Sequence, residues 1–268
     1  MMRKAVILAR GLGRRMRTPS LAEHLNPSQA AVADTGLKAM MPFRRPFLDY
    51  LLSALADAGF EEACLVIGNE HDVVRAHYTT TPPERIRVHF AVQPEPLGTA
   101  NAVLAAEEFA RTEHFLTINS DNYYPLSALR MLRSLEEPAV ALFRDSSLIR
   151  GGIPRERILN FAICRVSSDG YLSEIIEKPT DGVQGSDHAG RLVSLNCWRF
   201  PPSIFDACRR TSLSSRGEYE LPTAVETAMS DFEVRFRVVV CEDPVLDLSS
   251  RADVATIAQK LTAVTANP

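Results

Sequence analysis

Glycines and arginines crowd a short segment near the N-terminus, where Gly11 and Gly13 bracket a turn and Arg14, Arg15 and Arg17 follow. Glycines let a backbone turn sharply and approach an anion closely, with N–H groups facing it. Arginine adds charge and paired donors, which suits a ligand with several phosphates. The segment is not a P-loop, because no lysine-serine or lysine-threonine pair closes it, and it lacks the third glycine of the dinucleotide fingerprint. A surface turn with solvated arginines is the alternative.

Polar side chains also stand where predicted strands end. Gln93 closes one apolar stretch, and Gly98-Thr99 then opens a helical pattern. Asp121 follows the strand predicted over Phe115–Asn119. Open α/β sheets bind their ligands at the carboxyl ends of strands, so these positions are candidates for a site. The alternative for Asp121 is a turn residue or a helix cap.

Lysines stand beside two more apolar stretches. Lys38 comes just before one that leads to a predicted helix start at Pro46. Glu177 and Lys178 come just before Pro179, a residue that halts a strand. An acid beside a base is common on protein surfaces, so this pair is informative only in register with the other motifs.

The wider apolar pattern alternates between strands and helices. After a first strand that begins at Ala5, further strands are expected over Ala63–Ile67, Ile86–Val92, Phe115–Asn119, Ala139–Phe143, Ala162–Val166, Val193–Phe200 and Val234–Cys241. Helices are expected over Pro46–Ala58, Asp72–Tyr78, Thr99–Arg111, Leu126–Leu135, Pro201–Arg209, Pro222–Met229 and Arg251–Val264. This alternation predicts an α/β fold with a mostly parallel central sheet and helices on both faces. A small antiparallel extension is expected between about Gly151 and Phe200.

Composition limits the class of protein. With 268 residues, 46% hydrophobic content and a net charge of −3, the chain can bury a core as one large domain or two closely packed ones. That charge gives no reason to expect nucleic-acid binding. No apolar stretch is long enough to cross a membrane and no leader peptide is visible, so we expect a cytoplasmic protein without a membrane partner. Five dispersed cysteines favour neither a disulfide framework nor a zinc site.

Taken in order, these motifs resemble those of the sugar-1-phosphate nucleotidyltransferases, which make nucleotide sugars from a nucleoside triphosphate and a sugar-1-phosphate. The resemblance runs from Ala5 to about Val254 and rests on Ala9-Arg10-Gly11-Leu12-Gly13-Arg14-Arg15, Lys38, Gln93 with Gly98-Thr99, Asp121, Glu177-Lys178-Pro179, Gly217-Glu218-Tyr219-Glu220 and Asp247. It implies a Rossmann-like sheet, similar to that of GT-A glycosyltransferases, in a single domain over residues 1–268. Residues 1–145 would form the nucleotide-binding half, and residues 146–268 the sugar-phosphate half with a terminal helix.

The resemblance also implies roles for individual residues. The nucleotide would contact Leu8, Ala9, Gly11, Gly13, Arg14, Gln93, Gly98 and Thr99. Catalytic contacts would come from Arg15, Lys38, Asp121 and Lys178, with Mg²⁺ held by Asp121 and Asp247. The sugar phosphate would contact Glu177, Lys178, Asn196 and Trp198. Because the sugar phosphate is already an anion that can attack the α-phosphate in line, no protein nucleophile is needed.

Gln93 bears on the choice of base. Its amide offers one donor and one acceptor face, which match the imide edge of uracil or thymine. A glutamine at this place also resembles the uridylyl- and thymidylyltransferases more than the guanylyl members of the family. We therefore expect UTP or dTTP as the donor, with a plain polar strand end as the alternative for Gln93.

The chain departs from the family's pattern at several positions. Arg10 stands for an alanine and Arg14 for a threonine, and Trp198 stands where a glycine is usual. Either Trp198 reshapes the sugar pocket, or it turns into the core. The insert Thr18–Gly36 is expected to be a flap or a short helix that covers the triphosphate.

Two other functions stay open at the level of the sequence. One is a catalytically weak regulatory subunit that senses nucleotide sugars, which the altered loop and Trp198 make conceivable. The other is a nucleotide-sugar-dependent glycosyltransferase, whose metal motif usually needs a second carboxylate two residues after the first. Tyr123 stands at that place after Asp121. The identity of the sugar and the oligomeric state, a homo-oligomer included, are left open.

Overall fold

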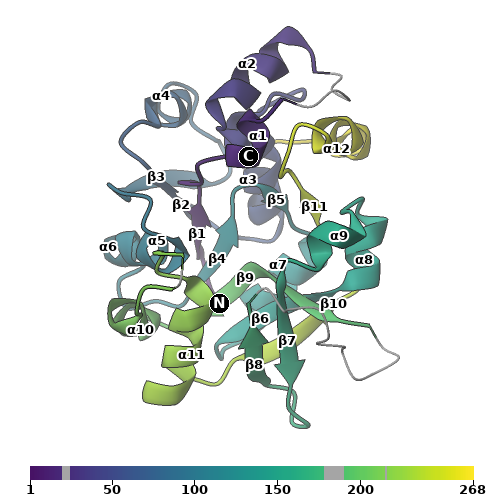
Figure 1. Cartoon of the computed structure of the whole chain (residues 1–268). Coiled ribbons are helices and arrows are strands. Elements are labelled where there is room, and N and C mark those ends of the chain that lie inside the picture. The colour runs from purple at the N-terminus through teal and green to yellow at the C-terminus, as the bar shows by residue number, and fades with distance from the viewer. Residues whose placement is uncertain (20–24, 178–189, 215) are drawn as a thin grey trace.

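The computed structural model describes residues 1–19, 25–177, 190–214 and 216–268 (Figure 1). Its centre is a nine-stranded sheet whose main path has the order β10-β6-β9-β4-β1-β2-β3, with β7 paired to β9 and β8 paired to β7 off this path. The strands are β1 (Lys4–Leu8), β2 (Glu62–Ile67), β3 (Arg87–Val92), β4 (Phe115–Asn119), β6 (Ala139–Arg144), β7 (Ala162–Val166), β8 (Leu172–Ile176), β9 (Leu192–Phe200) and β10 (Arg237–Cys241). A separate two-stranded ladder joins β5 (Asn122–Tyr123) to β11 (Leu246–Asp247).

Strand direction divides the sheet into two parts. β1 runs parallel to β2 and β4, and β2 runs parallel to β3. β9 runs antiparallel to β4, β6 and β7. The predicted mostly parallel α/β sheet with an antiparallel extension is therefore confirmed, and β9 joins the two parts.

Helices cover both faces of the sheet because the strands at its centre are apolar on both sides. On β1, Ile7 packs into one core cluster and Val6 into the other. The first cluster includes residues of α3 (Phe47–Asp57), α4 (Asp72–Thr80), α7 (Leu126–Ser134), α8 (Asp145–Arg150) and α9 (Arg155–Ile158). The second includes residues of α5 (Thr99–Ala105), α6 (Glu107–Ala110), α10 (Ile204–Arg210) and α11 (Leu221–Asp231).

A third apolar cluster lies beyond the end of the sheet. It joins α1 (Arg14–Arg17), α2 (Pro27–Thr35), the start of α3, β11 and α12 (Asp253–Leu261), which gather at one end of the molecule in Figure 1. A short 3₁₀ helix, η1 (Lys38–Met40), follows α2. This cluster brings segments from the two ends of the chain to the rim of the sheet.

The described part of the insert forms α2. Asn26 caps this helix by accepting from the backbone of Gln29, whose side chain accepts in return from the backbone of Asn26. The short-helix alternative is thus confirmed over Pro27–Thr35, while residues 20–24 lie outside the described residues. α2 packs against α1, and of the segment from 25 to 36 only Gly36 lines the large cavity described below. A covering role for the insert stays a prediction.

Trp198 is fully buried in the second core cluster. Its ring stacks on Phe200 with centroids 5.4 Å apart, and Phe236 meets it edge-on at the same separation. The prediction that Trp198 contacts the sugar phosphate is therefore wrong, since helices of the second face cover this part of β9. The core alternative for the indole is the one observed.

Other elements follow the sequence pattern closely. The helix predicted over Thr99–Arg111 is interrupted at Ala106, which leaves the helical region of the backbone. α8 and α9 were not anticipated, because each is too short to show an apolar period. Within the described ranges, no helix is long and apolar enough to cross a membrane.

Candidate active site

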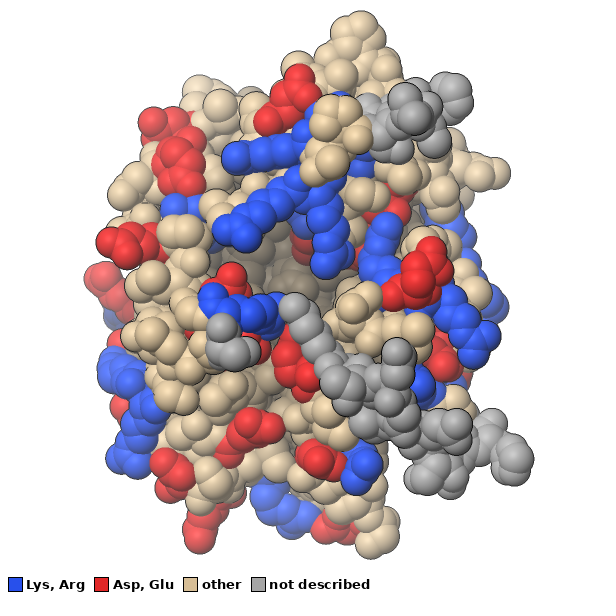
Figure 2. Space-filling view, viewed as in Figure 1, with Lys and Arg blue, Asp and Glu red and all other residues tan. Residues whose placement is uncertain are grey.

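A cavity of about 560 Å³ opens at the carboxyl ends of β1 and β4 (Figure 2). Figure 2 shows lysine and arginine side chains gathered around this hollow. The predicted site residues that line it are Leu8, Ala9, Gly11, Gly13, Arg14, Arg15, Lys38, Gln93, Gly98, Thr99, Asp121, Glu177, Asn196 and Asp247. Lys178 lies outside the described residues, and Trp198 lies in the core. The structure thus brings together residues from widely separated motifs, whose roles stay predictions.

The arginine loop depends on glycine at one position. Gly13 adopts a left-handed φ of 58°, and a Cβ there would lie 2.0 Å from the carbonyl oxygen of Gly36. Only glycine allows the loop to pack so closely on the segment that leads into Lys38. Arg14 and Arg15 follow at once as the first residues of α1, and Arg15 also donates to Ser249 Oγ at 3.3 Å.

Gln93 lies at the end of β3 and is 2% exposed. Its amide nitrogen donates to the carbonyl oxygen of Gly98 at 3.0 Å and to Asn101 Oδ1 at 2.8 Å. Both amide hydrogens are thereby committed, so the atom that this side chain offers to a ligand is the acceptor Oε1. Arg10 fixes the same strand end by donating to the Gln93 carbonyl at 3.1 Å, and it forms an ion pair with Glu70 at 2.6 Å.

Gly98 is the second position where close approach requires glycine. Its φ is 113°, and a Cβ would lie 2.4 Å from the carbonyl oxygen of Tyr219. Tyr219 donates its N–H to Leu97, and its carbonyl accepts from Ala100. The glycine-glutamate-tyrosine segment is therefore hydrogen-bonded to the loop that follows Gln93, although more than 100 residues separate them in the sequence.

Two neighbouring carboxylates line the cavity. Asp121 follows β4 and forms an ion pair with Lys38. Asp247 lies on β11, whose pairing with β5 sets it opposite Asn122. Burial, and then the charge of Asp121, raise the pKa of Asp247 from 3.8 to about 6. A half-buried and a largely buried acid that repel each other fit a divalent cation, since oxygen ligands suit Mg²⁺ and one or two carboxylates suffice when phosphates supply the rest.

The described residues would supply few ligands to a metal ion. Among the residues that the structure describes, no group of three or more His, Cys, Asp or Glu side chains is placed to hold a metal. Such a pair of carboxylates matches a cation that is shared with a phosphate ligand rather than a closed structural site.

A polar strip, formed by Asn119, Asn196, Glu177 and Arg216, lines another part of the cavity. Asn196, on β9, has a left-handed φ of 55° and donates to Asn119 Oδ1 at 3.3 Å. Glu177 lies 3.5 Å from the guanidinium of Arg216, whose Nε donates to Glu220 at 2.9 Å. The cavity is therefore lined by a further arginine away from the arginine loop, and this arginine is ion-paired with Glu177 and Glu220.

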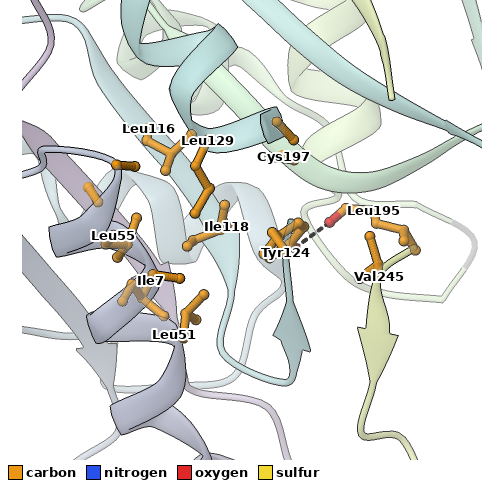
Figure 3. Close-up of a cluster of buried hydrophobic side chains, with 14 of the residues drawn as sticks. Ile7, Leu51, Leu55, Leu116, Ile118, Tyr124, Leu129, Leu195, Cys197 and Val245 are labelled. Carbon is orange, nitrogen blue, oxygen red and sulfur yellow. Dashed lines mark hydrogen bonds between the residues drawn. The ribbon is translucent and has the colours of Figure 1, made fainter. Parts of the chain in front are cut away.

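Buried Tyr124 joins the two parts of the sheet beneath this strip (Figure 3). Its hydroxyl accepts from the backbone N–H of Asn119 at 3.1 Å and donates to the carbonyl of Leu195. Burial, as the main cause, keeps the pKa of the Tyr124 phenol well above its usual value. The phenol is thus a neutral link between the end of β4 and the bend of β9.

Sequence reasoning missed Arg216 and Arg157. Arg216 stands directly before Gly217 of a recognised motif, so its place in the chain was a usable signal. Arg157 ion-pairs with Asp247 at 2.9 Å from the short helix α9, and no local pattern pointed to it. Asn119, the last residue of β4, was also overlooked, although strand ends were the expected place for such groups.

This arrangement is that of an α/β protein with a cleft lined by arginines, a lysine and carboxylates at the carboxyl ends of its strands. Comparison with known proteins makes the class specific, because the model of the nucleotidyl transferase family matches residues 4–241. The chain therefore belongs to the nucleotidyl transferase family. The predicted membership among enzymes of the sugar-1-phosphate type is confirmed by the named relatives that follow.

Two curated relatives show the degree of sequence similarity between this chain and named members of the family. The UTP–glucose-1-phosphate uridylyltransferase AglF of Haloferax volcanii is 26% identical over 83% of this chain and 82% of its own length. A glucose-1-phosphate thymidylyltransferase of Streptomyces griseus is 27% identical over 83% of this chain, which spans 56% of that enzyme. Among solved structures, a UDP-glucose pyrophosphorylase bound to UDP-glucose matches 98% of this chain with a TM-score of 0.74 at 18% identity, which shows the shared fold.

Proposed function

We propose that this protein transfers a uridylyl or thymidylyl group from UTP or dTTP to a sugar-1-phosphate and releases pyrophosphate. The observation that carries the proposal is one cavity that joins the arginine loop, two carboxylates and a further arginine, Arg216. Two polyanions can bind there only if cations surround them, and a carboxylate pair is of use beside phosphates only with a divalent cation.

Asp121 and Asp247 would hold Mg²⁺, which when bound neutralises charge on the α-phosphate. The protein's own residues orient the reactants. Arg14 and Arg15 bind the β- and γ-phosphates, and Arg216 binds the sugar phosphate from the other side. Arg14, Arg15 and Arg216 line one cavity, which would bring the two substrates together for an in-line approach.

The reaction needs no proton transfer by the protein. An oxygen of the sugar phosphate forms a bond to the α-phosphorus while the bond from that phosphorus to the bridging oxygen of the β-phosphate breaks. The electron pair leaves with pyrophosphate, whose growing charge Arg15 and Lys38 stabilise. This chemistry agrees with a site made of cations and carboxylates.

The proposed base preference rests on Gln93. Its amide nitrogen is occupied by Gly98 and Asn101, so Oε1 would be the atom that accepts from the base. Uracil and thymine have an N–H at ring position 3 that can donate to such an oxygen, and cytosine has none there. The names of the uridylyl- and thymidylyltransferase relatives support the same preference.

Pyrophosphate release over a matrix of nucleoside triphosphates and sugar-1-phosphates tests the proposal. UTP, dTTP, CTP, GTP and ATP would be combined with the 1-phosphates of glucose, galactose, mannose and N-acetylglucosamine, each with Mg²⁺ and with EDTA. We expect release with UTP or dTTP and one or a few sugars, and none with EDTA.

Other outcomes separate the competing functions. A clear preference for CTP, whose base has no N–H at ring position 3, would contradict the role of Gln93, and a clear preference for GTP would contradict the proposed pyrimidine preference. Tight binding of a nucleotide sugar in calorimetry without any pyrophosphate release would indicate a regulatory subunit. Consumption of a nucleotide sugar without pyrophosphate would indicate a glycosyltransferase.

A further inference from the structure

Arg157 forms a bridge between two buried carboxylates. Its two terminal nitrogens lie 2.9 Å from Asp247 Oδ2 and 2.9 Å from Asp253 Oδ1. The three side chains are 15%, 8% and 10% exposed, respectively. Because ion pairs out of water hold their geometry far better than exposed ones, this bridge fixes where each carboxylate points.

The bridge leaves Asp247 little freedom. Arg157 holds its Oδ2, and Asn122 Nδ2 donates to its Oδ1 at 3.1 Å. Asn122 is 2% exposed and follows Asp121 directly in the chain. Both oxygens of Asp247 are therefore oriented by side chains, and one of these belongs to the segment that carries the other carboxylate.

The other end of the bridge reaches the arginine loop. Asp253 Oδ2 accepts from the backbone N–H groups of Ser249 at 3.0 Å and Ser250 at 2.6 Å. Ser249 in turn accepts from Arg15. A continuous chain of hydrogen bonds thus runs from Asp247 through Arg157 and Asp253 to the residue proposed to bind the leaving pyrophosphate.

We propose that Arg157 is a positioning residue that sets the affinity of the Asp121 and Asp247 pair for a divalent cation. The inference rests on the cation site of the proposed function. Arginine is suited to the task because its planar guanidinium donates to two carboxylates at once, whereas a lysine ammonium is a single point charge. Groups that orient ligating carboxylates typically change metal affinity about 10- to 100-fold when they are removed.

The charge of Arg157 and its proposed positioning of Asp247 predict opposite effects of its removal on cation affinity. Replacing Arg157 by methionine removes a positive charge beside the carboxylates, which by Coulomb attraction alone would tighten cation binding. If Arg157 positions Asp247, the same change weakens binding, because the freed carboxylate turns away. The sign of the effect therefore identifies the role.

The experiment measures Mn²⁺ binding by electron paramagnetic resonance on the purified full chain without nucleotide, at a temperature well below unfolding. The variants are Arg157→Met, Arg157→Lys and the matched control Arg155→Met, which removes the same charge from an exposed position of the same helix. We expect the dissociation constant for Mn²⁺ to rise about 10-fold or more in Arg157→Met and less in Arg157→Lys. Arg155→Met should match the natural protein.

A second readout is the Mg²⁺ concentration for half-maximal pyrophosphate release, which should rise in the same order. Unchanged or tighter Mn²⁺ binding by Arg157→Met overturns the inference while leaving the proposed function intact. Should Arg157→Met fail to fold, Arg157→Lys decides, and an affinity equal to that of the natural protein overturns the inference. Absence of Mn²⁺ binding by the natural protein together with pyrophosphate release that does not depend on Mg²⁺ would instead overturn the proposed cation site itself.

Discussion

The cavity has two walls. The N-terminal wall, formed by residues between 8 and 122, is shaped mainly by backbone. The C-terminal wall, formed by residues between 160 and 249, is held mainly by side chains. On the N-terminal wall, Gly13 and Gly98 have left-handed φ values and touch backbone atoms that no Cβ could approach. On the C-terminal wall, Asn196, Arg216 and Asp247 are held by hydrogen bonds and ion pairs.

The two walls differ in how easily the residues that hold them can be found from the sequence. Gly13 follows directly from β1, so its role can be read from one short segment. The bond between Asn122 and Asp247 joins positions 125 residues apart, and that between Asn119 and Asn196 joins positions 77 apart. The glycines of the turns can be recognised locally, although Gly98 packs on the distant Tyr219, while the partners of Asn196 and Asp247 are set by the finished fold.

The largest effect is expected from Asp121→Asn. The change removes a charge from the end of β4 but keeps the shape of the side chain and touches no core group, so the fold should persist. Loss of a cation that stabilises the transition state by several kcal/mol should lower turnover by about 1,000-fold. Pyrophosphate release at saturating Mg²⁺, with circular dichroism as a check on folding, measures this. Activity near that of the natural protein would remove Asp121 from the site.

Trp198→Gly tests whether Trp198 stabilises the core and is not part of the C-terminal wall of the cavity. Truncating a fully buried tryptophan should lower the free energy of unfolding by about 4 kcal/mol and the melting temperature by about 10 °C. The companion variant Trp198→Phe keeps most of the ring contacts with Phe200 and Phe236 and should stay folded. Its preference among sugar-1-phosphates should equal that of the natural protein, and an altered preference would mean that the indole does shape the pocket.

Trp198 also shows where sequence reasoning ends. Strand alternation indicates which face of β9 a residue occupies, but it does not indicate how far along the strand the helical cover reaches. Asn196 lies in the cavity and Trp198, two positions on, lies under that cover. The strands, most helices and the glycine turns were predictable because each depends on a local pattern. Arg157 was not, since its partners on β11 and α12 are set by tertiary packing.

Paired arginine variants should separate the two walls by substrate. Arg216→Ala should raise the KM for the sugar-1-phosphate about 10- to 100-fold and change the KM for the nucleoside triphosphate little, because a charged hydrogen bond to phosphate is worth about 1.5 to 3 kcal/mol. Arg14→Ala should do the reverse. Initial rates with each substrate varied in turn give both constants. Equal changes in both constants for either variant would show that the walls do not divide the substrates in this way.

The smallest effect is expected at Arg10. Unlike the glycines of the N-terminal wall, Arg10 supports that wall through a hydrogen bond of its side chain. Arg10 is 8% exposed and holds the strand end by donating to the carbonyl of Gln93. Arg10→Ala would leave that carbonyl without this donor and loosen the base-binding amide. Since one hydrogen bond contributes about 1 kcal/mol, the KM for the nucleoside triphosphate should rise about 5-fold, with little change in kcat or in the KM for the sugar phosphate.

Glu70→Gln is the matched control for this change. Glu70 forms the ion pair with Arg10, but its side chain is 53% exposed, so the pair contributes little in water. We expect Glu70→Gln to leave the KM for the triphosphate within about 2-fold of the natural value, because the bond from Arg10 to Gln93 persists. If Glu70→Gln weakens nucleotide binding as much as Arg10→Ala does, the guanidinium is oriented by the ion pair. The N-terminal wall would then depend on a side-chain network as the opposite wall does.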